Sequence, residues 1–225
     1  MLSGLRGRRS HRPRVNCEPS AVVIAVIDYG IGNLRSAVKA MEHVGASASL
    51  VSDPGELADA SAVVLPGVGS FGRCAEALSA GSWRAPIREA VDSGIPFLGI
   101  CVGFQLLYEG SEESPGARGL GLLPGMVRRL PGHVKHPQIQ WNRVEAIAPN
   151  DLVPVDQDQD QWMYFVHSYA PSVGTETVAT CDYGGPVAAV VQSGSLCGVQ
   201  FHPEKSGDDG LALLRRFTEL VGVDR

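Results

Sequence analysis

A cysteine stands between two glycines in the segment GICVG, residues 99–103, directly after an apolar run and before a stretch typical of a helix. This G-x-C-x-G spacing is that of a nucleophile elbow, in which a strand turns sharply into a helix and presents its central side chain at the turn. Side chains at the glycine positions would collide where the chain doubles back, and the positive end of the following helix favours a thiolate. The segment predicts a thiol nucleophile at Cys101; a buried cysteine that only packs is the alternative.

A thiol nucleophile needs a base and a group that orients the base. The segment GVQFHPEKSG, residues 198–207, supplies His202 and Glu204. With Pro203 between them and the backbone extended, imidazole and carboxylate lie on the same side of the chain, as positions i and i+2 do in a strand. We therefore predict that His202 and Glu204 act together; a surface turn with a solvated charge is the alternative. The competing bases, none with an acid so placed, are His11, His43, His133, His136 and His167.

Acyl transfer also needs N–H donors for the developing oxyanion. One candidate is the backbone N–H of Val102, directly after the nucleophile. The other is the glycine-rich turn LPGVGSFG, residues 65–72, which ends an apolar run and could turn its main-chain N–H groups to the same pocket. A phosphate cradle is the other interpretation, but the glycine spacing matches neither the P-loop nor the dinucleotide fingerprint.

Strand and helix patterns alternate in the first half of the chain and must position these residues. Such alternation implies a parallel sheet with helices on both faces. Open sheets of this kind gather their sites at the carboxyl ends of the strands, where Cys101 and His202 are expected. Strands are predicted at 22–27, 47–51, 61–67 and 96–100, and helices at 33–45 and 74–94.

After about Gly121 the pattern changes to short alternating segments, which we interpret as antiparallel strands or hairpins added to the same sheet. The chain closes with a helix over 208–222. The expected fold class is α/β, a three-layer open sheet that is largely parallel with added antiparallel strands. The short strands are predicted at 126–130, 163–166, 177–181, 187–192 and 197–201, and the apolar face of the closing helix at Leu211, Leu214, Phe217 and Thr218.

Composition and charge divide the chain into a basic start and an acidic body. The 225 residues, 44% hydrophobic, are enough for one compact domain, expected at 21–225. Residues 1–20 contain five arginines and one glutamate and are predicted to be a disordered basic tail, with a targeting segment as the alternative. The remaining chain has 14 basic and 23 acidic residues, which argues against a nucleic-acid groove.

The cysteines favour a reducing compartment. There are five of them, without a CxxC pair or a metal-type spacing, so we expect no structural zinc, no other metal and no cofactor. No apolar run approaches the roughly 18 residues of a membrane span. We therefore expect a soluble, cytoplasmic protein. The five are Cys17, Cys74, Cys101, Cys181 and Cys197.

Taken together and in order, the segments LPGVGSFG, GICVGFQLLYEGSEE, YFVHSY and GVQFHPEKSG resemble the class I glutamine amidotransferases with a Cys-His-Glu triad. More narrowly, IDYGIGNLRS, WN at 141–142 and FVHSYA at 165–170 are similar to the glutaminase subunits of imidazole glycerol phosphate synthase, an enzyme of histidine biosynthesis. The resemblance runs from Val22 to about Phe217.

The resemblance assigns roles to individual residues. Cys101 matches the nucleophile, His202 its base and acid, and Glu204 the group that fixes the imidazole tautomer. Residues 66–69 match a segment that supplies the second oxyanion donor and rearranges on activation by the partner. The implied reaction is hydrolysis of glutamine to glutamate and ammonia through a γ-glutamyl thioester. The oxyanion positions are Val68, Gly69 and Val102, and those near the glutamine are Gly67, Gln105, His167, Ser168 and Tyr169.

Ammonia would mostly be protonated in neutral water, so it must travel through protein to its acceptor. The resemblance implies a heterodimer with a (β/α)8-barrel cyclase, which uses the ammonia on a phosphoribulosyl-formimino intermediate to make imidazole glycerol phosphate and aminoimidazole carboxamide ribotide. Asn33 and Lys205 would face this cyclase, with Trp141 and Asn142 at the interface near the ammonia exit. A solvated lysine and a core tryptophan are the alternatives at two of these positions.

One segment departs from the family pattern. The family usually has PHMGWN or PHIGWN where this chain has PQIQWN, with Gln138 and Gln140 as the differences. A side chain at Gln140, next to Trp141, would alter coupling to the cyclase. Two other classes were weighed. The segments DYGIGNLRS and FVHSYA speak against the glutaminases of pyridoxal phosphate synthase and anthranilate synthase, and the intact triad speaks against a non-enzymatic binding protein.

Overall fold

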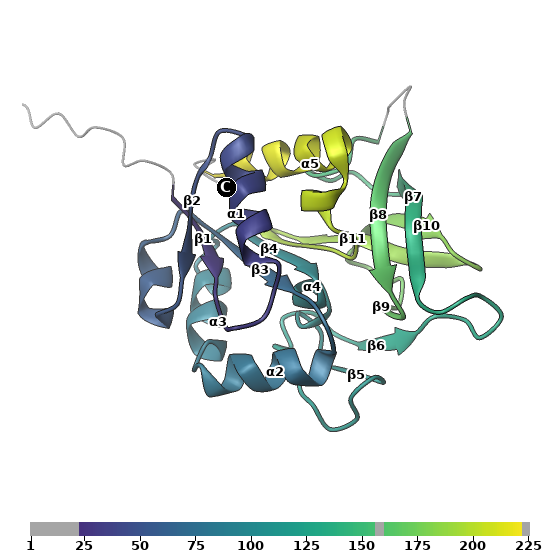
Figure 1. Ribbon diagram of the computed structural model, residues 1–225, viewed down its shortest axis with the longest axis horizontal. Coiled ribbons are helices and arrows are strands. Elements are labelled where there is room, and N and C mark those ends of the chain that lie inside the picture. The colour runs from purple at the N-terminus through teal and green to yellow at the C-terminus, as the bar shows by residue number, and fades with distance from the viewer. Residues whose placement is uncertain (1–22, 156–159, 222–225) are drawn as a thin grey trace, which may run out of the picture.

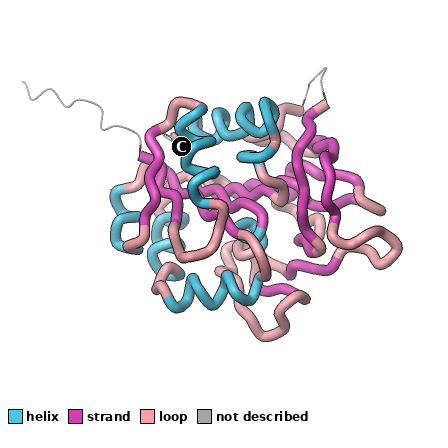
Figure 2. The backbone as a smooth tube through the Cα atoms, in the orientation of Figure 1, coloured by secondary structure: helices cyan, strands magenta, loops and turns pink. Residues whose placement is uncertain are grey.

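The computed structural model describes residues 23–155 and 160–221. The predicted basic tail, residues 1–20, lies outside the described residues. Within the described part, nine strands form the main sheet in the order β2-β1-β3-β4-β12-β11-β10-β7-β8 (Figure 1). Figure 2 shows helices gathered over the β1–β4 end of this sheet, while the β7–β8 end consists of strands and loops.

The first half of the sheet is parallel, as predicted. The strands β1, β3 and β4 are almost wholly buried on both faces, so they consist of short uninterrupted apolar runs. All neighbours from β2 to β12 pair in parallel. The bounds are β1 Val23–Ile27, β2 Ser47–Val51, β3 Ala62–Gly67, β4 Phe97–Cys101 and β12 Leu196–Val199.

Helices cover both faces of the parallel half. Because β1 lies between β2 and β3, the crossovers β1–β2 and β3–β4 run in opposite directions across the sheet. Right-handed crossovers then place α1 on one face and the pair α2 and α3 on the other. The last helix, α5, packs beside α1 (Figure 1). The helices are α1 Leu34–His43, α2 Phe71–Ala80, α3 Arg84–Asp92, α4 Val102–Gln105 and α5 Gly207–Glu219, with short 3-10 turns η1 Pro54–Asp59 and η2 Pro203–Lys205.

The second half of the sheet is antiparallel. Strand β11 pairs with β12 and β10, and β7 connects β10 to the edge strand β8. Strand β8 alternates buried and more exposed residues, which fits a sheet with one covered face. The bounds are β7 Gln138–Ala146, β8 Gln161–His167, β10 Thr177–Asp182 and β11 Pro186–Ser193.

Four details differ from the sequence prediction. The segment predicted as one helix over 74–94 is two helices, because the chain breaks at Gly81 and Ser82, where Ser82 has φ +58°. The strand predicted at 126–130 does not join the main sheet; as β6 it forms a small second sheet with β5 and β9. The nine-residue strand β7 was not predicted, and β12 ends at Val199 rather than residue 201. The small sheet comprises β5 Gly110–Ser111, β6 Met126–Arg129 and β9 Tyr169–Pro171.

Candidate active site

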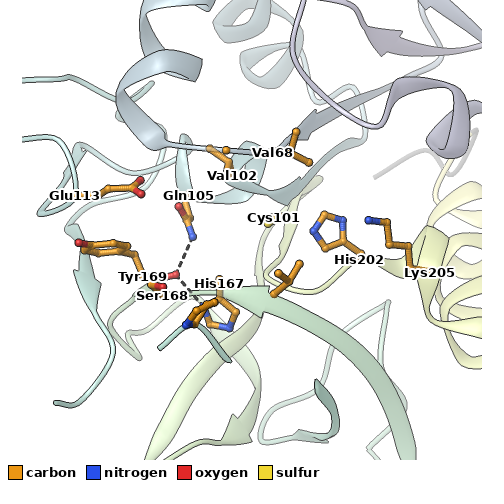
Figure 3. Close-up of a pocket in the computed structure, with 13 residues that line it drawn as sticks. Val68, Cys101, Val102, Gln105, Glu113, His167, Ser168, Tyr169, His202 and Lys205 are labelled. Carbon is orange, nitrogen blue, oxygen red and sulfur yellow. Dashed lines mark hydrogen bonds between the residues drawn. The ribbon is translucent and has the colours of Figure 1, made fainter. Parts of the chain in front are cut away.

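A cavity of about 420 Å³ lies at the carboxyl ends of β4 and β12. Ten of the residues predicted from the sequence line it, among them Cys101 and His202 (Figure 3). Glu204 and Gly67 lie behind this lining, and three predicted interface residues lie outside it. The lining residues are Val68, Gly69, Cys101, Val102, Gln105, Glu113, Pro137, Val166, His167, Ser168, Tyr169, His202 and Lys205.

Cys101 sits on a strained turn. It ends β4 with φ +54° and ψ −110°, a conformation that non-glycine residues rarely adopt and that a surrounding structure must enforce. A Cβ at Gly103 would overlap the carbonyl oxygen of Leu65 on β3, and one at Gly99 would lie 2.9 Å from the backbone of Phe104. Both glycines are therefore required by close backbone approach, which confirms the predicted elbow.

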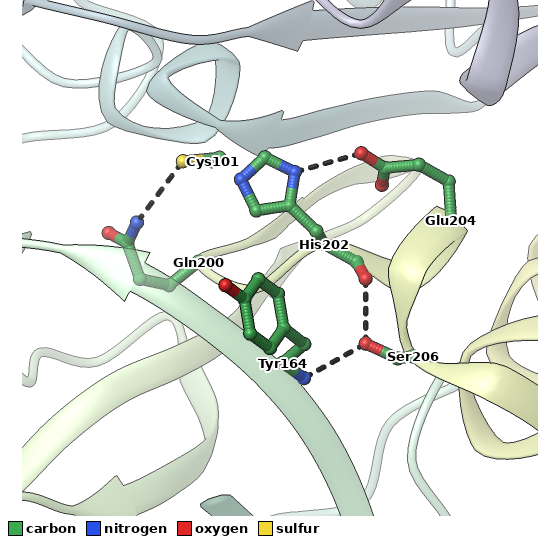
Figure 4. A network of polar contacts seen from close by, with 6 residues as sticks. All are labelled: Cys101, Tyr164, Gln200, His202, Glu204 and Ser206. Carbon is green, nitrogen blue, oxygen red and sulfur yellow. Dashed lines mark hydrogen bonds and ion pairs between the residues drawn. The ribbon is translucent and has the colours of Figure 1, made fainter. Parts of the chain in front are cut away.

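The helix after the elbow is short. Helix α4 has only four residues, so it supplies the N–H groups of one turn rather than the dipole of a long helix. The sulfur is instead surrounded by side chains from the segment after β12. Gln200 Nε2 donates to Cys101 Sγ at 3.9 Å, and the imidazole of His202 faces the sulfur from another side (Figure 4).

His202 and Glu204 form a buried pair. Their side chains are each 3% exposed, and Nδ1 of His202 lies 2.8 Å from Oε1 of Glu204. The predicted pairing is confirmed, but the predicted cause is wrong. His202 is extended, whereas residues 203–205 form the 3-10 turn η2, and this turn folds the carboxylate back onto the imidazole.

The backbone of His202 is tied to the edge strand β8. Its N–H donates to the carbonyl of Tyr164 at 3.0 Å, and its carbonyl accepts from Ser206 Oγ at 2.6 Å. The same hydroxyl accepts from the N–H of Tyr164 at 3.0 Å (Figure 4). Ser206 thus closes a ring of hydrogen bonds that holds the base in position relative to the sheet.

The surroundings of His202 favour its charged form. Burial alone lowers its pKa, but hydrogen bonds with Cys101 and Glu204 outweigh burial and raise the pKa to about 10. At neutral pH the imidazole ring is therefore positively charged, with a proton on each of its two nitrogens, and it lies between the sulfur and the carboxylate. This is an arrangement that activates a cysteine nucleophile and can protonate a leaving amine.

Two side chains bind the backbone of the glycine-rich turn, residues 65–72. The hydroxyl of Tyr29 donates to the carbonyl of Pro66 at 2.9 Å, and Cys74 Sγ donates to the carbonyl of Val68 at 3.4 Å. Gly67 ends β3 opposite Cys101, and a Cβ there would press on the backbone of Gly103. The turn and the elbow are therefore packed directly against each other, as an oxyanion site requires.

Sequence reasoning missed two polar residues of the site. Glu113 lines the cavity at the end away from His202, beside Tyr169, and accepts from the N–H of Phe71 at 2.7 Å (Figure 3). No spacing in the sequence indicates this carboxylate. Gln200, which is fully buried, could have been found, because it stands two positions before His202 and the residues i and i+2 of extended chain share a side.

His167 is held neutral inside the site. Its Nδ1 donates to the carbonyl of Tyr169 at 2.9 Å, since that oxygen can only accept. Burial lowers its pKa to about 4; the hydrogen bond to Tyr169 opposes this shift, and the charge of His202 adds to it. Nε2 of His167 has no hydrogen-bond partner among the described residues.

The predicted interface residues lie around one apolar surface. Trp141 is 49% exposed and packs edge to face on Tyr164, so the core-tryptophan alternative is wrong. Ile139 and Trp162, 59% and 46% exposed, share this face, because positions 139, 141 and 143 of β7 pair with 166, 164 and 162 of β8.

The other predicted interface residues lie at a helix start, on β7 and in the cavity wall. Asn33 precedes α1 and its carbonyl accepts the first helical N–H groups, Asn142 donates to the carbonyl of Asp182, and Lys205 lines the cavity. Gln138 is fully buried. Gln140 directly precedes Trp141 on β7, and strand alternation turns the two side chains to opposite faces of the β7–β8 pair. Its effect on coupling to a partner stays a prediction.

The described part of the chain contains no group of three or more acidic, histidine or cysteine side chains that could hold a metal ion. In the same residues, no helix has both the length and the apolar character needed to cross a membrane. Among the cysteines that the structure describes, Cys74, Cys101 and Cys181 are buried thiols outside any disulfide.

Comparison with known proteins defines the class. Residues 25–220 match the family model for glutamine amidotransferase class-I. A solved structure described as a glutamine amidotransferase covers 90% of this chain with a TM-score of 0.71 at 22% identity, and PurLQS from Thermotoga maritima covers 88% with a TM-score of 0.70 at 22% identity. These structures share the fold, covering 100% and 98% of their own chains. The chain belongs to the class-I glutamine amidotransferases.

Curated relatives narrow the assignment. HisH, a subunit of imidazole glycerol phosphate synthase, is 45% identical in Moorella thermoacetica over 203 residues, covering 88% of this chain and 95% of that protein. The HisH proteins of Methanothermobacter thermautotrophicus and Halobacterium salinarum are 44% and 46% identical, covering 88% and 87% of this chain and 99% and 92% of theirs. Within the class, the chain belongs with the HisH subunits.

The close packing at Gly103 predicts that a methyl group added there lowers the stability of the fold. Gly103→Ala should lower the free energy of unfolding by about 3 kcal/mol or more, because its Cβ meets backbone that cannot move independently. Denaturant titration of the purified chain measures this change. Gly132→Ala is the matched control: nothing lies within 4 Å of its Cβ, so we expect a change within about 0.5 kcal/mol. Equal changes in the two variants would contradict the close packing of elbow and β3.

His167 predicts a pH dependence of stability. Its folded pKa, about 4, lies below the unfolded value of about 6.5, so the unfolded state binds more protons and stability falls as the pH drops through this window. From pH 7.5 to 5 the wild type should lose about 2 kcal/mol more than His167→Asn. Denaturant titrations at both pH values measure this. The exposed His43→Asn is the control and should lose as much as the wild type; a His167→Asn variant that behaves like the control would refute a buried neutral imidazole.

Proposed function

We propose that this chain hydrolyses L-glutamine to glutamate and ammonia and passes the ammonia to a (β/α)8-barrel cyclase subunit, together forming imidazole glycerol phosphate synthase. The observation that carries this proposal is the strained Cys101 facing the buried pair of His202 and Glu204 inside a cavity. The similarity to HisH subunits supports the choice of acceptor pathway. The buried thiols of Cys74, Cys101 and Cys181 support a reducing compartment such as the cytoplasm.

The geometry supports a two-step acyl transfer. The sulfur of Cys101 attacks the carboxamide carbon, and the developing oxyanion is bound by the N–H of Val102 and by N–H groups of residues 68–69. As the C–N bond breaks, His202 gives its proton to the leaving nitrogen and ammonia departs. Water then attacks the thioester while His202 takes one of its protons, and glutamate leaves as the sulfur departs. Glu204 holds the imidazole through Nδ1 in both steps.

The two ends of the cavity match the two ends of an amino acid that carries a side-chain amide. The sulfur lies at one end, where the carboxamide must be. Glu113 lies at the other end, where a carboxylate would pair with the α-ammonium group of glutamine. Gln105 and residues 167–169 line the wall between them. This charge placement favours a free amino acid over an uncharged amide.

The apolar surface of Ile139, Trp141 and Trp162 supports a partner that covers the cavity. Val166, opposite Ile139 on β8, lines the cavity, so the surface continues into its rim. The first residue of α5 approaches Trp141, and α1, which starts after Asn33, packs against η2 with Lys205. A barrel subunit seated here would shield departing ammonia from water, and half-exposed tryptophans are typical anchors of such interfaces.

Removal of the thiol tests the proposed chemistry. Cys101→Ala should abolish glutamine-dependent synthesis by the complex with the cyclase, because no thioester can form. It should leave synthesis from added ammonium salts intact, because the cyclase is unaffected. Product formation with each nitrogen source measures both. Loss of the two activities together, or retention of both, would refute a role limited to supplying ammonia.

Removal of one indole tests the docking surface. Trp141→Ala should weaken binding to the cyclase about 30-fold, as expected for an interface anchor, and should reduce glutaminase activation accordingly. Calorimetry and glutamine hydrolysis at increasing cyclase concentration measure these effects. Gln140→Ala is the matched control, since its side chain is exposed on the opposite face of the strand pair. Equal weakening by both variants would place the interface elsewhere.

A further inference from the structure

Gln200 lies between the nucleophile and the substrate-facing Gln105 and is fully buried. Its Oε1 accepts from Gln105 Nε2 at 3.1 Å, and its Nε2 donates to Cys101 Sγ at 3.9 Å. Both polar ends of this amide are therefore used within the site. No step of the mechanism above employs it.

The orientation of this amide follows from one backbone carbonyl. The oxygen of Tyr169 can only accept, so the atom of Gln105 that faces it at 2.8 Å must be the nitrogen Nε2. The same nitrogen donates its second hydrogen to Gln200, so the atom of Gln200 that receives it must be the oxygen. The amide nitrogen of Gln200 is left facing the sulfur, where it can only donate (Figure 4).

We propose that Gln200 is a positioning residue that couples Gln105 to the nucleophile: Gln105 fixes the Gln200 amide so that its N–H points at Cys101 Sγ. This inference rests on the glutaminase chemistry proposed above and deepens it. At 3.9 Å the contact is long for a neutral sulfur and strengthens when the sulfur carries charge, because charged acceptors bind N–H donors more strongly. The donor therefore stabilises the attacking form of the nucleophile.

The coupling also links substrate binding to reactivity. Gln105 is buried but lines the cavity, and its amide nitrogen donates to both Tyr169 and Gln200. A bound substrate that changes the position of the Gln105 side chain therefore also changes the orientation of the Gln200 amide. Residues 105 and 101 do not share a hydrogen bond. If Gln200 only filled space, a change at Gln105 would therefore leave the reactivity of Cys101 unchanged.

The test is a double-mutant cycle read out by alkylation. Iodoacetamide reacts with Cys101 without needing glutamine hydrolysis, and peptide mass spectrometry assigns the modified cysteine. Gln200→Met should slow alkylation of Cys101 about tenfold, the loss expected for one donor to a charged acceptor. Gln105→Met should slow it to a similar extent although Gln105 shares no hydrogen bond with the sulfur, and the double variant should be no slower than either single variant.

Controls separate coupling from loss of structure. Gln161→Met removes another buried glutamine, at the start of β8, and should leave the alkylation rate unchanged; melting temperatures are measured for every variant. Gln200→Glu keeps an acceptor for Gln105 but no donor for the sulfur, and should also slow alkylation. An unchanged rate in Gln105→Met or Gln200→Glu, or multiplicative effects in the double variant, would overturn the coupling. Glutamine hydrolysis retained by Cys101→Ala would instead overturn the proposed function and leave this cycle readable.

Discussion

The strained backbone at Cys101 is the constraint on which the site depends. A φ of +54° at a side-chain-bearing residue persists only if its neighbours leave no alternative. Here β3 and β12 pair with β4 on either side, and the backbone of α4 approaches β3 so closely that only glycine fits at position 103. The buried parallel sheet therefore has a direct chemical role, because it supplies the rigidity that keeps the sulfur turned into the cavity.

The two halves of the sheet contribute different parts of the site. The parallel half carries the elbow and the glycine-rich turn, while the antiparallel half carries the apolar surface of β7 and β8. His202 belongs to both: it follows β12, yet its backbone is bound to Tyr164 of β8 directly and through Ser206. Tyr164 in turn packs against Trp141. The surface that suits a partner is thus one residue away from the anchor of the catalytic base.

The sequence predicted the parts of this structure that local chemistry decides. Buried strands such as β4 must be apolar, and the elbow needs glycines at fixed positions, so both are readable. Strand β7 was missed because its apolar residues Ile139 and Trp141 are exposed while the polar Gln138 is fully buried, which inverts the usual pattern. Glu113 was missed because the contact that holds it, with the N–H of Phe71, joins residues 42 positions apart.

The remaining freedom of the site lies in the glycine-rich turn. The His202–Glu204 pair is already assembled beside Cys101, with Nδ1 of His202 2.8 Å from Oε1 of Glu204 and both side chains deeply buried. The carbonyls of Pro66 and Val68, by contrast, are each held by one side chain, the Tyr29 hydroxyl and the Cys74 thiol. Any rotation of the peptide units between these carbonyls must carry or break those two bonds, and a thiol donor is weak. The bond to Val68 is therefore the less costly of the two to break.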